Sequence, residues 1–217
     1  VNSTMHAMIG GRDEVGIPTN YFHGNMNQRA VFNRALTSGE MAALAADNSA
    51  HAFTDFVSKG DMVDWTWNGN VDDTYDQVKD RSGHGHHYVP LVATDLVQFT
   101  SASSQRASGG TTVLPAGSSG FSGHVSSLPG DVGGLQAIVS KENRSSGNTH
   151  HLFEIEFYLN TVIFYVWDSS AGSYMGRQSG AVTAGLPYNI VGTYDGGTTQ
   201  ASVRLWINVT EHTGTFS

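Results

Sequence analysis

The sequence contains no cysteine, few basic residues and no long apolar run. Without cysteine, disulfides and thiolate metal sites are excluded. Lysine and arginine number 11 against 19 acidic residues, for a net charge of -8. Because binding to a nucleic-acid backbone needs clustered basic residues, we expect no nucleic-acid partner. No apolar stretch approaches the roughly 20 residues of a membrane span, so we expect no membrane insertion either.

Glycine is abundant instead, at 26 residues, and serine and threonine are frequent. This composition is typical of an all-β protein, whose many turns use these residues. A chain of 217 residues is long enough to bury the core of one large β-sandwich, and we expect a single one.

Apolar and polar residues alternate along several segments, as strands require. The clearest segment spans 151–159, where the apolar side chains are expected to face the core and Glu154 and Glu156 a solvated surface. The other predicted strands are 24–32, 63–67, 91–99, 135–140, 161–167, 188–194 and 202–208. Between them, the Ser- and Gly-rich stretch 100–134 shows no clear strand boundaries.

A helix start signal follows the first predicted strand. Thr37-Ser-Gly-Glu40 is a capping box, in which the Thr37 hydroxyl meets the backbone amide near Glu40 and the carboxylate reaches back. Met41, Leu44 and Ala45 then form one apolar face at helical spacing. The sequence therefore predicts one short helix near residues 38–46, packed against the edge of the sandwich.

Three segments resemble the central strands of laminin G-like modules: Ala137-Ile-Val-Ser-Lys141, Val191-Gly-Thr-Tyr-Asp-Gly196 and Leu205-Trp-Ile-Asn208. The resemblance implies an antiparallel two-sheet jelly-roll β-sandwich of the concanavalin A-like kind. Its segments stand in rotated order. Val63-Asp-Trp-Thr-Trp-Asn-Gly-Asn70 and Lys79-Asp-Arg-Ser-Gly-His-Gly85 resemble the start of such a module, and residues 24–44 resemble its end.

The rotated order suggests how residues 1–217 are organised as one sandwich. Residues 1–47 match the last strands and helix of the family, 48–60 form a connector, and 61–217 match its first and central strands. Joining 213–217 to 1–10 would restore an uninterrupted pair of penultimate strands. The order fits a circular permutation, a window cut from a tandem array, or a protomer whose residues 1–47 complete a neighbouring unit.

All three arrangements avoid an open sheet edge, and the array and strand donation are favoured over simple permutation. The resulting functional expectation is a non-enzymatic structural or adhesive module at an extracellular, cell or virion surface. Its partners would be copies of itself or neighbouring repeats. The alternative is a lectin-like module that binds glycans, and a glycoside hydrolase is the third class.

The hydrolase alternative depends on Glu154 and Glu156, which strand geometry places about 7 Å apart on one face. Paired carboxylates at roughly 5 to 9 Å can cleave glycosides. The laminarinase-type relatives of the fold carry three alternating acids, whereas Tyr158 occupies the third position here. We therefore assign no catalytic residue.

Two other groups are candidate binding sites. The first is a structural calcium site, for which hard oxygen ligands are offered by Asp72, Asp73, Asp76 and Asp80. Beside Asp80 stand three histidines, His84, His86 and His87. We interpret them as a coincidence of a loop sequence rather than as a transition-metal site. Glycans stack on aromatic rings, for which the candidates are Tyr21, Trp167, Tyr174 and Tyr194.

Overall fold

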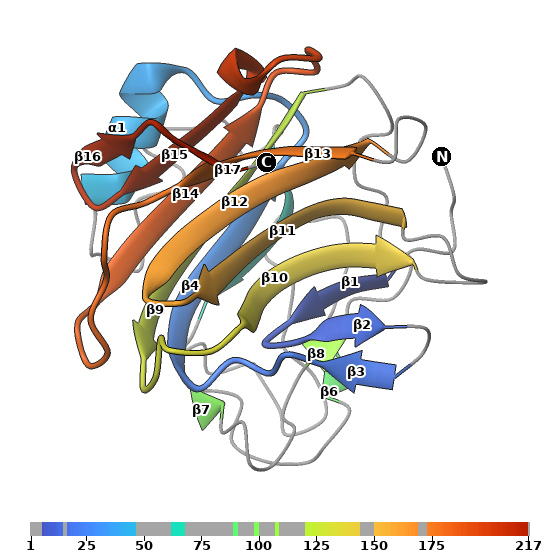
Figure 1. Ribbon diagram of the computed structural model, residues 1–217, viewed down its shortest axis with the longest axis vertical. Helices are drawn as coiled ribbons and strands as arrows, with labels where there is room; N and C mark the ends of the chain where they lie inside the picture. Colours follow the sequence, from blue (N-terminus) through green and yellow to red (C-terminus); the bar gives the residue numbers. More distant parts are fainter. Residues whose placement is uncertain are drawn as a thin grey trace.

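The computed structural model describes residues 6–14, 17–46, 62–67, 89–90, 98–99, 107–108, 120–143, 150–168 and 173–216. Within these ranges the chain forms two large antiparallel sheets packed face to face, with a small hairpin at one edge and an α-helix on one outer face (Figure 1). The predicted all-β sandwich with one short helix is confirmed. No helix in the described part of the chain has the length and apolar character needed to cross a bilayer.

The eight-stranded sheet contains the central β-meander of the chain. In spatial order its strands are β17 (Gly214–Phe216), β13 (Ser173–Gln178), β12 (Thr161–Asp168), β11 (His150–Tyr158), β10 (Gln136–Asn143), β1 (His6–Ile9), β8 (Ala107–Ser108) and β6 (Val89–Pro90). The hairpin of β2 (Arg12–Glu14) and β3 (Ile17–Thr19) lies beside β10.

The seven-stranded sheet forms the other layer. Its order is β16 (Thr210–His212), β15 (Val203–Ile207), β14 (Tyr188–Tyr194), β9 (Phe121–Pro129), β4 (Gly24–Phe32) and β5 (Met62–Trp67), with β7 (Gln98–Phe99) also paired to β4. The 3-10 turn η3 (Gln200–Ser202) precedes β15, and α1 (Ser38–Ala46) follows β4.

Most predicted strands lie where the alternation placed them. The predictions for β4 and β14 match their bounds, and those for β5, β10, β11, β12 and β15 differ by one to three residues. The stretch without clear boundaries contains β9, a central strand that pairs with both β14 and β4. Of the predicted strand 91–99, only β7 lies within the described residues.

The main core lies between the two sheets and depends on a close approach of their backbones. Phe164 of β12 points at Gly192 of β14, where an added Cβ would lie 2.5 Å from the ring. Phe121 packs on the same ring at a centroid distance of 6.3 Å and on Phe153 at 4.9 Å. Glycine at 192 therefore sets how near the sheets can come, because any side chain there would hold them apart.

A second, smaller core lies between α1 and the outer face of the seven-stranded sheet. It consists of Ala30, Phe32, Leu36, Met41, Leu44, Ala45 and Val191, with Trp206 packed against it. Because β14 faces the main core on one side and α1 on the other, all seven of its residues are buried. The predicted apolar face of the helix is the one that docks.

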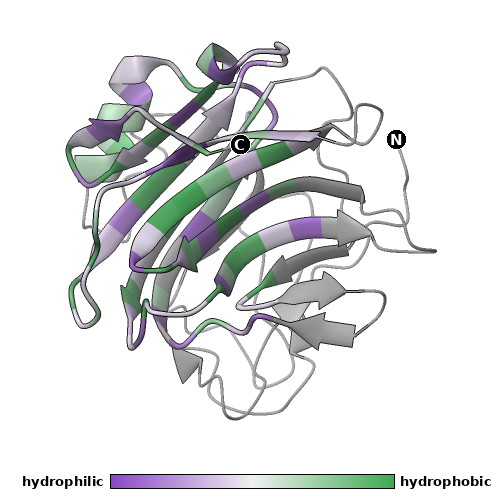
Figure 2. Cartoon of the chain, in the orientation of Figure 1, coloured by the Kyte–Doolittle hydropathy of each residue, from purple (hydrophilic) through white to green (hydrophobic). Residues whose placement is uncertain are grey.

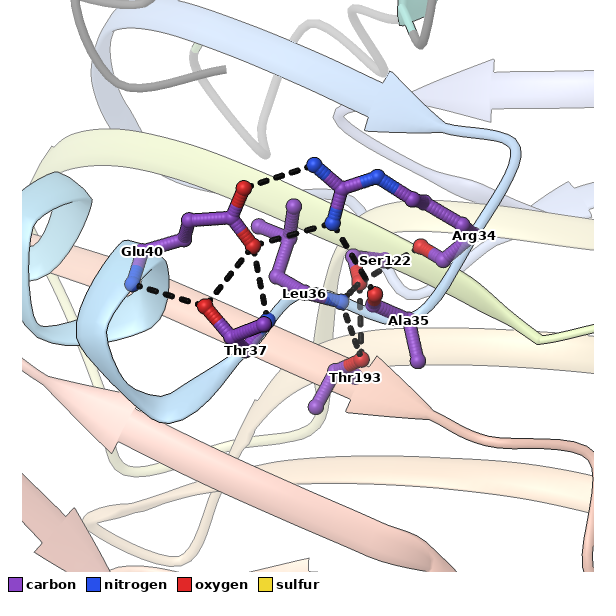
Figure 3. Close-up of polar contacts among 7 residues, drawn as sticks. All are labelled: Arg34, Ala35, Leu36, Thr37, Glu40, Ser122 and Thr193. Atoms are coloured by element: carbon purple, nitrogen blue, oxygen red, sulfur yellow. Dashed lines mark hydrogen bonds and ion pairs between the residues drawn. The ribbon is translucent and has the colours of Figure 1, made fainter.

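The segment before α1 is held to the sheet by a set of hydrogen bonds (Figure 3). Thr37 and Glu40 form the predicted capping box, since the Glu40 amide donates to Thr37 Oγ1 at 3.3 Å and the Thr37 amide to Glu40 Oε2 at 2.8 Å. Arg34 donates to the same carboxylate from Nη1 at 2.9 Å and from Nη2 at 2.6 Å. The hydrogen bond from Arg34, with those from Thr37, lowers the pKa of Glu40 to about 2.

Leu36, in the same segment before α1, connects that segment by hydrogen bonds to β9 and β14. The Leu36 amide donates to the Ser122 hydroxyl at 2.9 Å and to that of Thr193 at 3.2 Å, and these two hydroxyls lie 2.7 Å apart (Figure 3). Small hydroxyl side chains on two neighbouring strands thus satisfy a buried backbone donor.

The N-terminal segment is integrated into both sheets of its own chain. β1 lies between β10 and β8, and β4 lies between β9 and β5. β17, the last described strand, pairs with β13 and is separated from β1 by four strands. β17 and β1 are therefore two separate strands with different neighbours, and residues 1 and 217 themselves lie outside the described part.

A histidine lies under the helix. His124 of β9 is paired in register with Ala30 and Val191 of the second core, and it is 1% exposed. Burial lowers its pKa from 6.5 to about 3, so the ring stays neutral in the folded protein at all but strongly acidic pH.

We predict that removing the helix cap destabilises the sandwich. Thr37→Ala deletes the hydroxyl that caps the Glu40 amide and should lower the free energy of unfolding by about 1 kcal/mol, measured by urea denaturation. Thr37→Ser keeps the hydroxyl and should remain within about 0.5 kcal/mol of the wild type. Equal losses in the two variants would show that the cap does not contribute.

His124 should make the protein sensitive to mild acid. The unfolded chain binds a proton at His124 below its ordinary pKa of 6.5, and the folded chain does not, so stability falls as pH drops through this range. The expected loss from this group is about 1.5 kcal/mol between pH 6.5 and about pH 5. His124→Gln should remove that part of the slope in unfolding curves measured across the range, and an unchanged slope would contradict the assignment.

Candidate functional site

An aromatic cluster covers the outer face of the eight-stranded sheet at its β17 edge. Trp167 and Tyr174 are partners in register and their rings stack at 5.5 Å with an interplanar angle of 23°. Phe216 of β17 stacks on Tyr174 at 5.2 Å, and its centroid is 5.8 Å from that of Tyr165. We call Tyr165, Trp167, Tyr174 and Phe216 the aromatic cluster.

Alternation along β12 explains why these rings gather on the outer face. Val162, Phe164 and Val166 belong to the main core, so the intervening residues point away from it. Tyr165 and Trp167 are two of those, and Tyr174 follows them across the register to β13. Figure 2 shows the apolar character of β12 continuing along most of its length, as expected of a strand with apolar residues on both faces.

Exposure differs across the cluster and decides which ring a ligand can reach. Tyr165 is 6% exposed and lies at its base, whereas Tyr174 is 36% exposed. Trp167 and Phe216 are half-buried. A ligand would therefore meet Tyr174 first, with the two half-buried rings beside it.

Glycine in β13 allows β13 to approach Tyr165 of β12 closely. A Cβ on Gly176 would be 2.7 Å from the Cβ of Tyr165 and 2.8 Å from the carbonyl oxygen of Phe164. Gly176 is the register partner of both Tyr165 and Phe216. The absent side chain leaves the space between these rings and Tyr174.

Two polar side chains hold β17, and with it Phe216, in place. Arg177 donates to the carbonyls of Val203, Gln200 and Thr213 at 2.8, 2.8 and 3.0 Å, and so joins the two sheets and β17. Gln200 donates to the Phe216 carbonyl at 3.1 Å and accepts from the Gly176 amide at 3.2 Å. The cluster is thus built on a backbone fixed from behind.

The two acids of β11 lie on the same outer face but are closed to solvent. Glu154 is 0% exposed and Glu156 2% exposed. Tyr165 donates its hydroxyl to Glu154 Oε2 at 2.5 Å, and the Ser140 hydroxyl, next to Glu154 in register, donates to the Gly11 carbonyl beside the β2–β3 hairpin. The expected solvated face is therefore wrong for these acids, because both are buried and the Tyr165 side chain packs on Glu154.

The predicted ligand-binding residues separate in the structure. Trp167 and Tyr174 come together in the cluster. Tyr194 is 8% exposed and packs on Phe121 at 5.7 Å in the main core, away from any surface. Tyr21 is half-buried and forms an isolated bridge to Ala137 of β10, two strands away from β12.

Sequence reasoning did not find Tyr165 and Phe216. The alternation of β12 could have identified Tyr165, because it places this residue on the same face as Trp167. No sequence signal pointed to Phe216, since β17 is three residues long and joins the cluster only through its pairing with β13.

The candidate metal sites are not part of the described structure. Asp72, Asp73, Asp76 and Asp80, and likewise His84, His86 and His87, lie outside the described residues. Among the residues that the structure does describe, no three His, Asp or Glu side chains gather in a way that could hold a metal ion.

Comparison with known proteins yields no relative: no family model, curated protein or solved structure matches this chain. The laminin G-like resemblance therefore stays a prediction, and the functional argument depends on the geometry of the aromatic cluster.

We predict that Gly176 cannot carry a side chain. Gly176→Ala places a methyl group against the backbone of β12 and should lower the free energy of unfolding by about 1–3 kcal/mol, measured by chemical denaturation. Gly180→Ala is the matched control, because nothing lies within 4 Å of its added Cβ, and it should change stability by less than about 0.5 kcal/mol. Equal stability of the two variants would contradict the packing described.

Proposed function

We propose that this chain is a non-enzymatic adhesive module of an extracellular or virion-surface structure, and that it binds a glycan through the aromatic cluster. The observation that supports the proposal most directly is the exposed ring of Tyr174, stacked between Trp167 and Phe216 on a rigid sheet. Aromatic side chains present apolar surface with a polar hydroxyl or indole group, which suits the mixed surface of a sugar ring.

The chemistry around the cluster favours an uncharged sugar. Among the described residues of β12, β13 and β17, Arg177 is the only basic one, and its guanidinium is engaged with three backbone carbonyls. Gln178 lies on the cluster face, two residues beyond Gly176, and is half-buried with a hydrogen bond to Thr161. Sulfated or sialylated glycans would need a free cation, which the described residues of these three strands do not offer.

Burial of the acids weighs against the hydrolase alternative. A general acid and its partner must reach the glycosidic oxygen and a water, and Glu154 and Glu156 are both closed to solvent. Tyr158 in place of a third acid points the same way.

The pairing of β1 and β4 within their own chain also reduces the support for assembly by strand donation. Strand donation was favoured because a sandwich without residues 1–47 would leave open edges. In this chain β1 and β4 each lie between two strands of the same chain, which supports strand donation less than the sequence order alone did. Adhesion through a side-chain surface is therefore the better-supported function.

The test is a glycan array followed by titration calorimetry on the strongest neutral hit. Tyr174→Ala removes the most exposed ring and should weaken binding at least tenfold, a loss of about 1.4 kcal/mol. Leu186→Ala, which removes a more exposed apolar side chain elsewhere, should bind like the wild type. Binding unaffected by Tyr174→Ala, or no bound glycan at all, would overturn the proposal.

The same samples test the absence of catalysis. Prolonged incubation of the bound glycan with the wild type should release no new reducing ends. Release that disappears in Glu154→Gln would instead assign a glycoside hydrolase.

A further inference from the structure

Tyr165 and Glu154 form a buried pair beneath the aromatic cluster. They are register partners on the neighbouring strands β12 and β11 (Figure 1), and the phenol of Tyr165 donates to Glu154 Oε2 at 2.5 Å. This length is typical of a charge-assisted O–H···O bond, which is stronger than a bond between two neutral groups. Tyr165 is 6% exposed and Glu154 0% exposed, so little water can compete for the bond.

The pair belongs to one row of cross-strand partners on the outer face of the eight-stranded sheet. Phe216, Gly176 and Tyr165 occupy this row on β17, β13 and β12. Glu154 and Ser140 continue it on β11 and β10. Because Gly176 places no side chain between them, the rings of Phe216 and Tyr165 approach to 5.8 Å although they come from strands that are not neighbours. Through Tyr165, the row connects the cluster to a buried acid.

Tyr165 is the ring against which the other rings of the cluster pack. Its centroid lies 5.9 Å from that of Tyr174, the most exposed ring of the cluster, at an interplanar angle of 55°. Phe216 packs against it at an angle of 45°. Trp167 lies two residues further along β12 on the same face and stacks on Tyr174. A change in the direction of the Tyr165 ring would therefore move the surface that the other three rings present.

Packing alone does not require an acid under this ring. A phenylalanine at position 165 above an apolar residue at position 154 would fill the same space without taking a carboxyl group out of water. Replacing a buried polar pair by apolar residues is often neutral or stabilising. An apolar pair does not, however, determine where the far end of the ring lies. A buried hydrogen bond does, because it is formed in one geometry.

Glu156, the other buried acid of β11, occupies a different row. It is 2% exposed and lies on the same outer face, two residues from Glu154. Its register partner on β12 is the aliphatic residue Ile163 rather than a ring of the cluster. The two acids therefore share a strand, a face and a degree of burial, and they differ in their partner on β12.

We propose that Glu154 is a positioning residue of the glycan-binding surface, which holds the aromatic cluster in its binding conformation through the hydrogen bond with Tyr165. This inference rests on the proposed function, because the ligand is the one assigned there to the cluster. Glu154 itself does not touch the glycan. Its contribution is preorganisation: rings that are already held in place lose little conformational freedom when the ligand binds.

Titration calorimetry with the strongest neutral glycan measures the effect on affinity. Tyr165→Phe removes only the hydroxyl and Glu154→Leu removes the acceptor, and each should raise the Kd at least about fivefold. Glu154→Gln keeps an oxygen acceptor at the same place in the side chain and should recover most of the affinity that Glu154→Leu loses. Glu156→Leu is the matched control and should bind like the wild type, because its partner on β12 lies outside the cluster.

Fluorine NMR of protein labelled with fluorotryptophan reports on the cluster without any ligand. The Trp167 resonance, identified by its absence from Trp167→Phe, should shift or broaden in Tyr165→Phe and in Glu154→Leu. It should stay in place in Glu156→Leu and return toward its wild-type position in Glu154→Gln. A role of the pair in stability alone would lower the melting temperature and leave this resonance of the folded protein unchanged.

Wild-type affinity in Tyr165→Phe overturns the proposal, and so does an unchanged Trp167 resonance in that variant. Equal losses in Glu154→Leu and Glu156→Leu would also overturn it, since the effect would then follow from burial and not from the bond to Tyr165. If Glu154→Leu does not fold, Tyr165→Phe decides the question, because it removes a single oxygen atom. If the wild type binds no glycan, the proposed function fails, and the Trp167 resonance alone decides whether Glu154 orders the cluster.

Discussion

The contact between the Phe164 ring and the backbone of Gly192 fixes the distance between the two sheets, and the rest of the structure is arranged around it. Phe121 of the facing sheet packs both on the same ring and on Phe153 of the neighbouring strand β11. The close spacing makes β14 the innermost strand, with the main core on one face and α1 on the other. From this centre, alternation along β12 sends Tyr165 and Trp167 to the opposite surface, where the aromatic cluster forms.

Short sequence patterns predicted the helices and strands whose hydrogen bonds and side-chain contacts depend on residues close together in the chain. The capping box at Thr37 identified the start of α1 because its hydrogen bonds join residues three apart. Alternation identified β11, and a short apolar run beside it identified β12. β9 was not predicted, because its outward-facing residues contact segments that are distant in the sequence. Ser122 accepts a hydrogen bond from the Leu36 amide, and His124 lies beneath α1. A strand covered on both faces by distant segments has no solvated face to produce a pattern.

The candidate site could be predicted only in part, because its residues meet through the pairing of strands that are apart in the sequence. Trp167 and Tyr174 stood out as large aromatic residues, but their meeting depends on the register of β12 with β13. Phe216 joins them through a three-residue strand that Arg177 and Gln200 hold from the opposite face. For Glu154 and Glu156 the sequence predicted the correct face and the wrong environment, because strand periodicity gives direction but not what packs above.

The position of β1 and β4 inside their sheets also governs how this chain can fold. The Leu36 amide finds its acceptor 86 residues later, and the Gly11 carbonyl its donor 129 residues later. During synthesis, β4 can pair early with β5, but it gains its second long neighbour, β9, only after residues 121–129 have been made, and β1 gains β10 later still. Closing such long loops before contacts compensate makes folding slow, and the waiting strands expose backbone groups that other chains can pair with. Yield on expression should therefore depend strongly on temperature and on chaperone capacity.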